Sequence, residues 1–151
     1  MPGVRGLFGE EGRAAVARFL EGRGWTVEEA RPVQASYRPG RSCLVRFRAR
    51  ASGPPGRRVF SICAETRHRP PRMHPPDQET ADRFDLAEPV EVVDPYLVWA
   101  FPYDPTLPRL GDAAWGAAVR ERLGRTADRP TAVSVQPLRY RPRRRAVFRY
   151  R

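Results

Sequence analysis

The side chains of this chain that could bind a charged substrate are mostly arginines, because the sequence contains no lysine and no asparagine. All 28 basic residues are arginines and 17 residues are acidic, so the formal net charge is +11. A phosphate-loop NTPase and a Schiff-base enzyme each need a lysine, and a protein-kinase site needs both a lysine and an asparagine. These 151 residues therefore cannot form any of those three sites by themselves. The codon usage of a GC-rich genome would produce the same bias.

Arginine is densest at the C-terminal end of the sequence. Residues 139–151 hold seven arginines, no acidic residue and three aromatic residues, a composition typical of a strand that neutralises phosphates and stacks on bases. Alternation, however, places Phe148 and Tyr150 on one face and Arg149 and Arg151 on the other, as in an ordinary half-buried strand. Single-stranded nucleic-acid binding is therefore kept as an alternative function. Its candidate residues are Arg139, Tyr140, Arg141, Phe148, Arg149, Tyr150 and Arg151.

Two further combinations contain reactive residue types without the spacing that their chemistry needs. Cys63, His68 and His74 could ligate a metal, but their spacing fits no structural zinc pattern. Ser61, His68 and Asp77 are the residue types of a hydrolase triad, but no nucleophile-elbow sequence surrounds the serine. We expect neither a metal site nor a hydrolase site.

The two cysteines lie almost symmetrically about the Gly53–Pro54 turn, so they could face each other across neighbouring strands. Cys43 and Cys63 could form a disulfide in that arrangement. In a cytoplasmic protein we expect two buried thiols instead.

The elements that would position these residues predict an α+β fold. Apolar residues recur at helical spacing from Phe8 to Leu20, and Gly22 and Gly24 provide the stop. Three antiparallel strands should follow, because apolar runs alternate with Pro-Gly and Gly-Pro turns. These strands are expected at Val33–Tyr37, Cys43–Arg48 and Val59–Ala64.

The second half of the chain predicts short strands, a second helix and a terminal hairpin. Strands are expected at Val90–Val93 and Tyr96–Phe101, before a connector stiffened by three prolines. Asp112 should cap the second helix, whose inner face would be Trp115, Ala118, Val119 and Leu123. We therefore predict an N-terminal helix packed on an antiparallel sheet, a second helix and a terminal β-hairpin.

Two segments of the chain resemble each other. Tyr37–Arg48 aligns with Tyr140–Arg151 at six identical positions of twelve, including the tyrosine, the proline and the apolar pattern. The repeat indicates a duplicated or mimicked strand-turn-strand unit. The second copy is cut off at Arg151, which would leave an unpaired strand at the edge of a sheet. Natural domains usually protect such a strand, so we expect the sequence to be the front part of something longer.

The repeat, the connector and their order resemble the N-terminal region of bacterial aminoglycoside-phosphotransferase-like kinases, the group with choline-kinase-type catalytic lobes. The matching segments are Tyr37–Arg41 with its following strand, Phe101–Pro108 and Leu138–Val147. In related maltokinase-like members, a helix and an antiparallel sheet form a cap before the nucleotide-binding lobe. The resemblance implies that this chain is the cap and an incomplete front lobe of such a kinase, which would transfer phosphate from ATP to a small hydroxyl compound.

The resemblance implies a site only at the second turn, where Arg143, Arg144 and Arg145 would lie near the ATP phosphates of a complete lobe. Arginines occupy that turn in place of glycines, and Phe60–Glu65, the strand matching the lysine-bearing one, offers no amine. This chain should therefore hold no cofactor and be inactive alone; ATP and magnesium belong to a full-length kinase. Its expected partner is a following catalytic lobe in cis, or a separate kinase partner.

The organisation that follows from these patterns is one compact unit. Residues 1–130 would form the cap-like domain and residues 131–151 the start of the second Tyr-Arg-Pro hairpin. No apolar run approaches the ~18 residues of a membrane span, and no secretory signal is recognisable, so we expect a cytoplasmic protein without a membrane partner. A second alternative is a protein-interaction module that offers the Pro-rich segment Arg69–Pro76 as an extended ligand.

Overall fold

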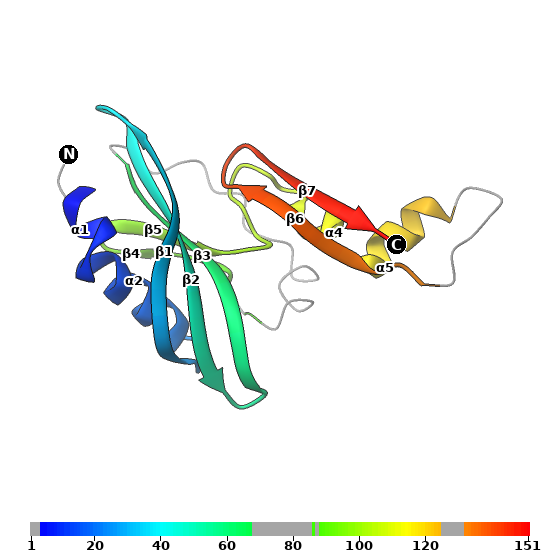
Figure 1. Cartoon of the computed structure of the whole chain (residues 1–151), viewed down its shortest axis with the longest axis horizontal. Coiled ribbons are helices and arrows are strands. Elements are labelled where there is room, and N and C mark those ends of the chain that lie inside the picture. The colour runs from blue at the N-terminus through cyan, green and yellow to red at the C-terminus, as the bar shows by residue number, and fades with distance from the viewer. Residues whose placement is uncertain (1–3, 68–85, 87, 125–131) are drawn as a thin grey trace.

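The computed structural model describes residues 4–67, 86, 88–124 and 132–151. It has the predicted α+β fold, with helices on one face of an antiparallel sheet and a separate C-terminal hairpin (Figure 1). The described helices are α1 (Val4–Phe8), α2 (Glu10–Glu21), α4 (Leu110–Ala113) and α5 (Gly116–Leu123). The described strands are β1 (Thr26–Arg38), β2 (Ser42–Gly53), β3 (Gly56–Arg67), β4 (Val90–Val93), β5 (Tyr96–Ala100), β6 (Val135–Arg141) and β7 (Arg145–Tyr150).

The N-terminal helical segment covers one face of the five-stranded sheet, whose strand order is β1-β2-β3-β5-β4. We predicted one helix from Phe8, but the structure has two, α1 and α2, which meet at Gly9. Gly12 permits their close contact, because a Cβ there would lie 2.1 Å from the Leu7 carbonyl oxygen. The buried face of α2 consists of Gly12, Ala15, Val16, Phe19 and Leu20.

The side chains of β2 and β3 alternate between the two faces of the sheet. On β2, Val45 and Phe47 point into the core with the helices, whereas Leu44 belongs to a second apolar cluster on the opposite face. The cysteines divide in the same way, with Cys43 in the helix-side core and Cys63 in the opposite cluster. The expectation that they face each other was therefore wrong, because Cys43 pairs in register with Thr66. Both thiols are free and buried, as expected.

The two repeated segments form hairpins of the same geometry. Tyr37 lies opposite Cys43, and the aligned Tyr140 lies opposite the aligned Ala146. Both turns place one residue in the left-handed region, at φ +68° for Gly40 and φ +62° for the aligned Arg143. The hairpins therefore share register and turn, although only the second has a side chain at that position.

The first three strands are longer than expected from the sequence, and the expected cap of the second helix was wrong. Strand β1 begins at Thr26, whereas the sequence indicated a strand only from Val33, because charged residues in its N-terminal half are not typical of a strand. Asp112 does not cap the second helix, because it lies inside the short helix α4 and forms an ion pair with Arg122. Helix α5 begins after Trp115 and buries Ala118, whereas Leu123 is exposed.

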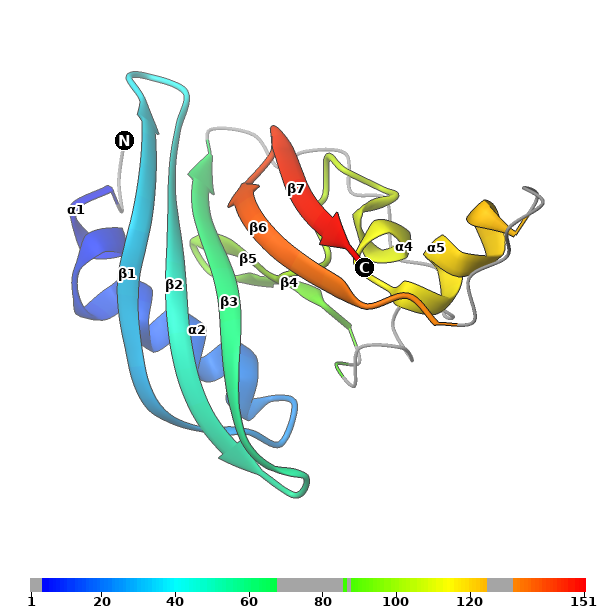
Figure 2. The same ribbon diagram turned by 45° about the vertical axis from the view of Figure 1, so that its right-hand side comes forward.

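The β6–β7 hairpin packs on the face of the main sheet that lies opposite the helices. Figure 1 and Figure 2 show the turn end of the hairpin near β3, with α4 and α5 toward its other end. The second apolar cluster joins the two parts and comprises Leu44, Cys63, Leu97, Trp99, Tyr103, Leu110 and Tyr140. Because this cluster covers only part of the face, the rest is open to form a site.

Candidate functional site

A buried carboxylate ties the connector to the hairpin. Asp104 is 1% exposed and its Oδ2 accepts hydrogen bonds from the Tyr140 hydroxyl and the Arg143 backbone N–H, both at 2.7 Å. Its Oδ1 accepts from the backbone N–H and the hydroxyl of Thr106, both at 2.9 Å. The Trp99 indole N–H donates to the Tyr140 oxygen at 3.2 Å. Four donors therefore satisfy this carboxylate, which makes it a structural anchor and leaves it no lone pair for a substrate.

A buried ion pair ties the same turn to the main sheet. Nη2 of Arg143 lies 2.7 Å from a carboxylate oxygen of Glu65, and the two side chains are 10% and 1% exposed. The guanidinium also lies 5.2 Å from the centre of the Trp99 ring, within the range of a cation–π interaction. Arg143 therefore points back into the protein.

Two groups near Asp104, the Tyr140 hydroxyl and the Cys63 thiol, have raised pKa values. Burial raises the pKa of Tyr140, and the charge of Asp104 raises it further. Burial also raises the pKa of the Cys63 thiol. Both groups are therefore neutral at physiological pH, and Cys63 is a poor nucleophile.

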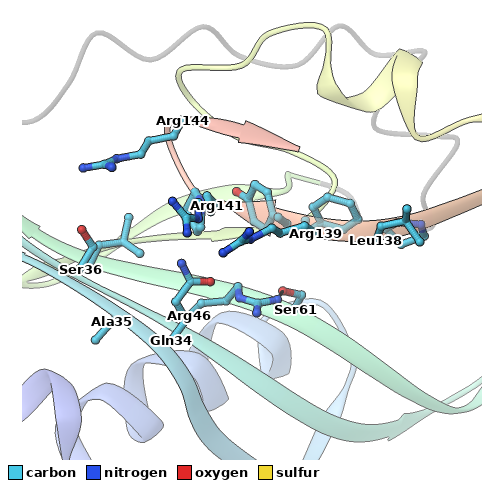
Figure 3. A pocket seen from close by; sticks show the side chains of 14 residues that line it. Gln34, Ala35, Ser36, Arg46, Ser61, Leu138, Arg139, Arg141 and Arg144 are labelled. Carbon is cyan, nitrogen blue, oxygen red and sulfur yellow. Dashed lines mark hydrogen bonds between the residues drawn. The ribbon is translucent and has the colours of Figure 1, made fainter. Parts of the chain in front are cut away.

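A cavity of about 680 Å³ lies beside this anchor, between β1–β3 and strand β6 (Figure 3). Among the described residues, four arginines and no acidic residue line its walls. Arg46 comes from β2, whereas Arg139, Arg141 and Arg144 come from the hairpin. Gln34, Ser36 and Ser61 add neutral polar groups, and Leu44, Phe101 and Leu138 add apolar surface.

The cavity arginines have little to compensate their charge. Among the described residues, none of the four forms an ion pair. Arg46 reaches only the Ser61 hydroxyl, at a long 3.5 Å, and its buried Nε has no hydrogen-bond partner within the described part of the chain. The positive charge of Arg139 is the main cause that lowers the pKa of Arg141 below its ordinary value. The arrangement can bind an anion.

The three arginines expected near a nucleotide lie in different environments. Arg143 pairs with Glu65, so its guanidinium is not presented to solvent. Arg144 lines the cavity, and Arg145 is exposed on β7 without lining it. The structure therefore does not bring the three guanidinium groups together.

The aromatic residues proposed to stack on nucleic-acid bases also lie in different environments. Tyr140, at 6% exposed, is unable to stack on a base, which corrects the expectation that it forms a platform. Phe148 packs on Phe101 with ring centres 6.3 Å apart. Tyr150 remains exposed and donates a hydrogen bond to the Ala113 carbonyl. Arg139 and Arg141 line the cavity, whereas Arg149 and Arg151 are exposed elsewhere.

Sequence reasoning missed the residues that organise this site. The sequence predicts that Arg46 points outward from a half-buried strand, and the structure agrees. No residue near Arg46 in the sequence indicates that the C-terminal hairpin lies over it. Glu65 and Asp104 could have been noticed as single acidic residues among apolar ones. Their partner, Arg143, is 78 and 39 residues away along the chain.

The described residues contain no group of His, Cys, Asp or Glu that could hold a metal ion. His68, His74, Asp77 and the Pro-rich segment Arg69–Pro76 lie outside the described residues. Among the described helices, none has the length and apolar character that crossing a membrane requires.

Comparison of the chain with protein-family models, with curated proteins and with solved structures finds no match.

Proposed function

We propose that this chain is the non-catalytic cap and front part of an aminoglycoside-phosphotransferase-like kinase that transfers phosphate from ATP to a small hydroxyl compound. In this proposal the cap supports the hairpin on which the catalytic lobe continues in cis.

The observation that supports this function is the buried junction around Asp104. Two of the three segments that resemble the kinases, Phe101–Pro108 and Leu138–Val147, meet there through the hydrogen bonds of Tyr140 and Arg143. Glu65 of β3 joins the junction from the main sheet. Such a junction fixes the hairpin on the cap, which is what a cap would have to do to orient a lobe that follows.

The chemistry of the residues supports the non-catalytic part of the proposal. The first hairpin leads into Phe60–Glu65, which has no amine to anchor phosphates, and the chain contains no asparagine for a kinase catalytic loop. Of the arginines at the second turn, Arg143 is engaged by Glu65. The chemistry would therefore belong to a following lobe.

The experiment that tests the proposal is to sequence the gene beyond codon 151. We expect the reading frame to continue into a strand that carries a lysine and, farther on, into a catalytic loop with an aspartate and an asparagine. A stop codon directly after codon 151, or an unrelated following domain, would overturn the proposal.

A second candidate function is single-stranded nucleic-acid binding, favoured by the uncompensated arginines of the cavity and by the exposed Tyr150. It predicts an affinity for single-stranded RNA that falls steeply with salt. The burial of Tyr140 and the packing of Phe148 on Phe101 weigh against it, because they remove two of its three stacking platforms.

A further inference from the structure

The cavity between the main sheet and β6 combines features that a structural crevice does not need. Two of its four arginines, Arg139 and Arg144, are exposed to solvent, as charges in any surface crevice can be, whereas Arg46 is half-buried. Here Arg46 projects from the floor of the cavity and Arg139 and Arg141 reach toward the same space from β6 (Figure 3). The cavity therefore concentrates positive charge from two separate elements.

Arg46 provides the strongest argument for a bound ligand. Its side chain is half-buried, and its Nε–H is fully covered without a hydrogen-bond acceptor among the described residues. Leaving a buried charged donor unsatisfied is costly, and in native proteins such groups nearly always have a protein, water or ion partner. An anion in the cavity would supply the missing acceptor.

The composition of the walls restricts the chemistry of that anion. A guanidinium binds the oxygens of a phosphoryl group through two parallel hydrogen bonds, and several guanidinium groups on opposite walls call for more than one such group. A volume of about 680 Å³ exceeds what one phosphate fills and is typical of small-molecule sites. Ser36, Gln34 and Leu138 could contact the uncharged body of a ligand.

We propose that this cavity binds a small organic molecule that carries two or more phosphoryl groups, held between Arg46 of the sheet and Arg139, Arg141 and Arg144 of the hairpin. The site is distinct from a kinase active site and does not depend on the proposed function. It would remain if the chain had no catalytic lobe, and a lobe could follow a chain that binds no such ligand.

The test is isothermal titration calorimetry of the chain with pyrophosphate and with a sugar bisphosphate. Inorganic phosphate and sulfate serve as single-anion probes, and a short single-stranded RNA serves as the nucleic-acid probe. The variants are Arg46→Gln and Arg141→Gln. The matched controls are Arg48→Gln, two residues farther along β2, and Arg149→Gln on β7, because neither control residue lines the cavity.

We expect the sugar bisphosphate to bind more tightly than inorganic phosphate, and each cavity variant to weaken it at least about tenfold, as loss of a charge-assisted hydrogen bond does. The controls should change its affinity by less than about threefold, as expected for a distant, screened charge. Circular dichroism and thermal unfolding verify that each variant is folded.

Three results would overturn the proposal. The first is the absence of binding by both pyrophosphate and the sugar bisphosphate. The second is an equal loss of affinity in the cavity variants and the controls, which would indicate attraction by net charge alone. The third is tighter binding of the RNA than of either small phosphate, which would assign the cavity to a nucleic-acid interface.

Discussion

Arg143 adopts a backbone conformation that an arginine rarely adopts. At φ +62° an L-residue with a Cβ is less stable than a glycine by about 1 kcal/mol, and the aligned position of the first hairpin is indeed Gly40. The arginine remains compatible with the turn because its side chain pairs with Glu65 and lies against Trp99. The positive φ of Arg143 therefore destabilises the folded chain, whereas its ion pair stabilises it.

Substitution of this residue separates the two effects. We expect Arg143→Ala to lower the free energy of unfolding by about 3–5 kcal/mol, because it removes the guanidinium that pairs with the buried Glu65 carboxylate. Arg143→Gly should be about 1 kcal/mol less damaging than Arg143→Ala, because glycine adopts the positive φ without strain. Urea unfolding of the three proteins measures both differences. Equal stability of the alanine variant and the unmodified chain would show that the ion pair is not formed.

At the scale of elements, two tyrosines connect neighbouring layers. Tyr140 fixes the hairpin to the connector through Asp104, and Tyr96 of β5 donates a hydrogen bond to Glu11 of α2 at 2.9 Å. Burial is the main cause that raises both pKa values, that of Tyr96 to about 12. Each phenol is therefore held neutral in the folded chain at a pH where it would ionise in the unfolded one.

These shifts predict a loss of stability at alkaline pH. Because the folded pKa exceeds the unfolded value of 10.0, the stabilising contribution of Tyr96 is complete below pH 10 and is lost as the pH rises from there to about 12. Tyr140 contributes a loss of the same sign that also begins near pH 10. Urea unfolding at a series of pH values should show this decline.

Tyr140→Phe should reduce the steepness of the alkaline decline. At neutral pH it should also cost about 1–3 kcal/mol, because Asp104 loses a buried donor. Tyr37→Phe is the matched control at the aligned, exposed position of the first hairpin and should change neither quantity. An unchanged pH dependence in Tyr140→Phe would contradict the conclusion that Tyr140 contributes to the alkaline decline.

At the scale of the whole molecule, sequence patterns predicted the helices and strands that depend on residues close together in the chain. The helical spacing of Ala15, Val16 and Phe19 and the alternation of β2 identified the helix-on-sheet core. Strand β1 was recognised only in part, because Glu28 and Glu29 are disfavoured in strands and form ion pairs that local propensity does not register. The contacts of Arg143 with Glu65 and Asp104 depend on docking of the hairpin, which no local pattern specifies.

The described part of the molecule is thus a helix-covered sheet that holds a hairpin on its other face (Figure 2). An arginine-lined cavity lies beside the junction. The arginines of this region therefore lie in two different environments. Arg143 stabilises the junction, whereas Arg46 and Arg141 face the cavity. The net charge of +11 alone would not have distinguished them.

The most direct test of the central claim is an assay of phosphate transfer from magnesium-ATP to a panel of small hydroxyl compounds. The gene product read past codon 151 and residues 1–151 alone are assayed side by side. We expect transfer by the longer product and none by residues 1–151. Transfer by residues 1–151 alone, or none by the longer product with any acceptor of the panel, would contradict the central claim.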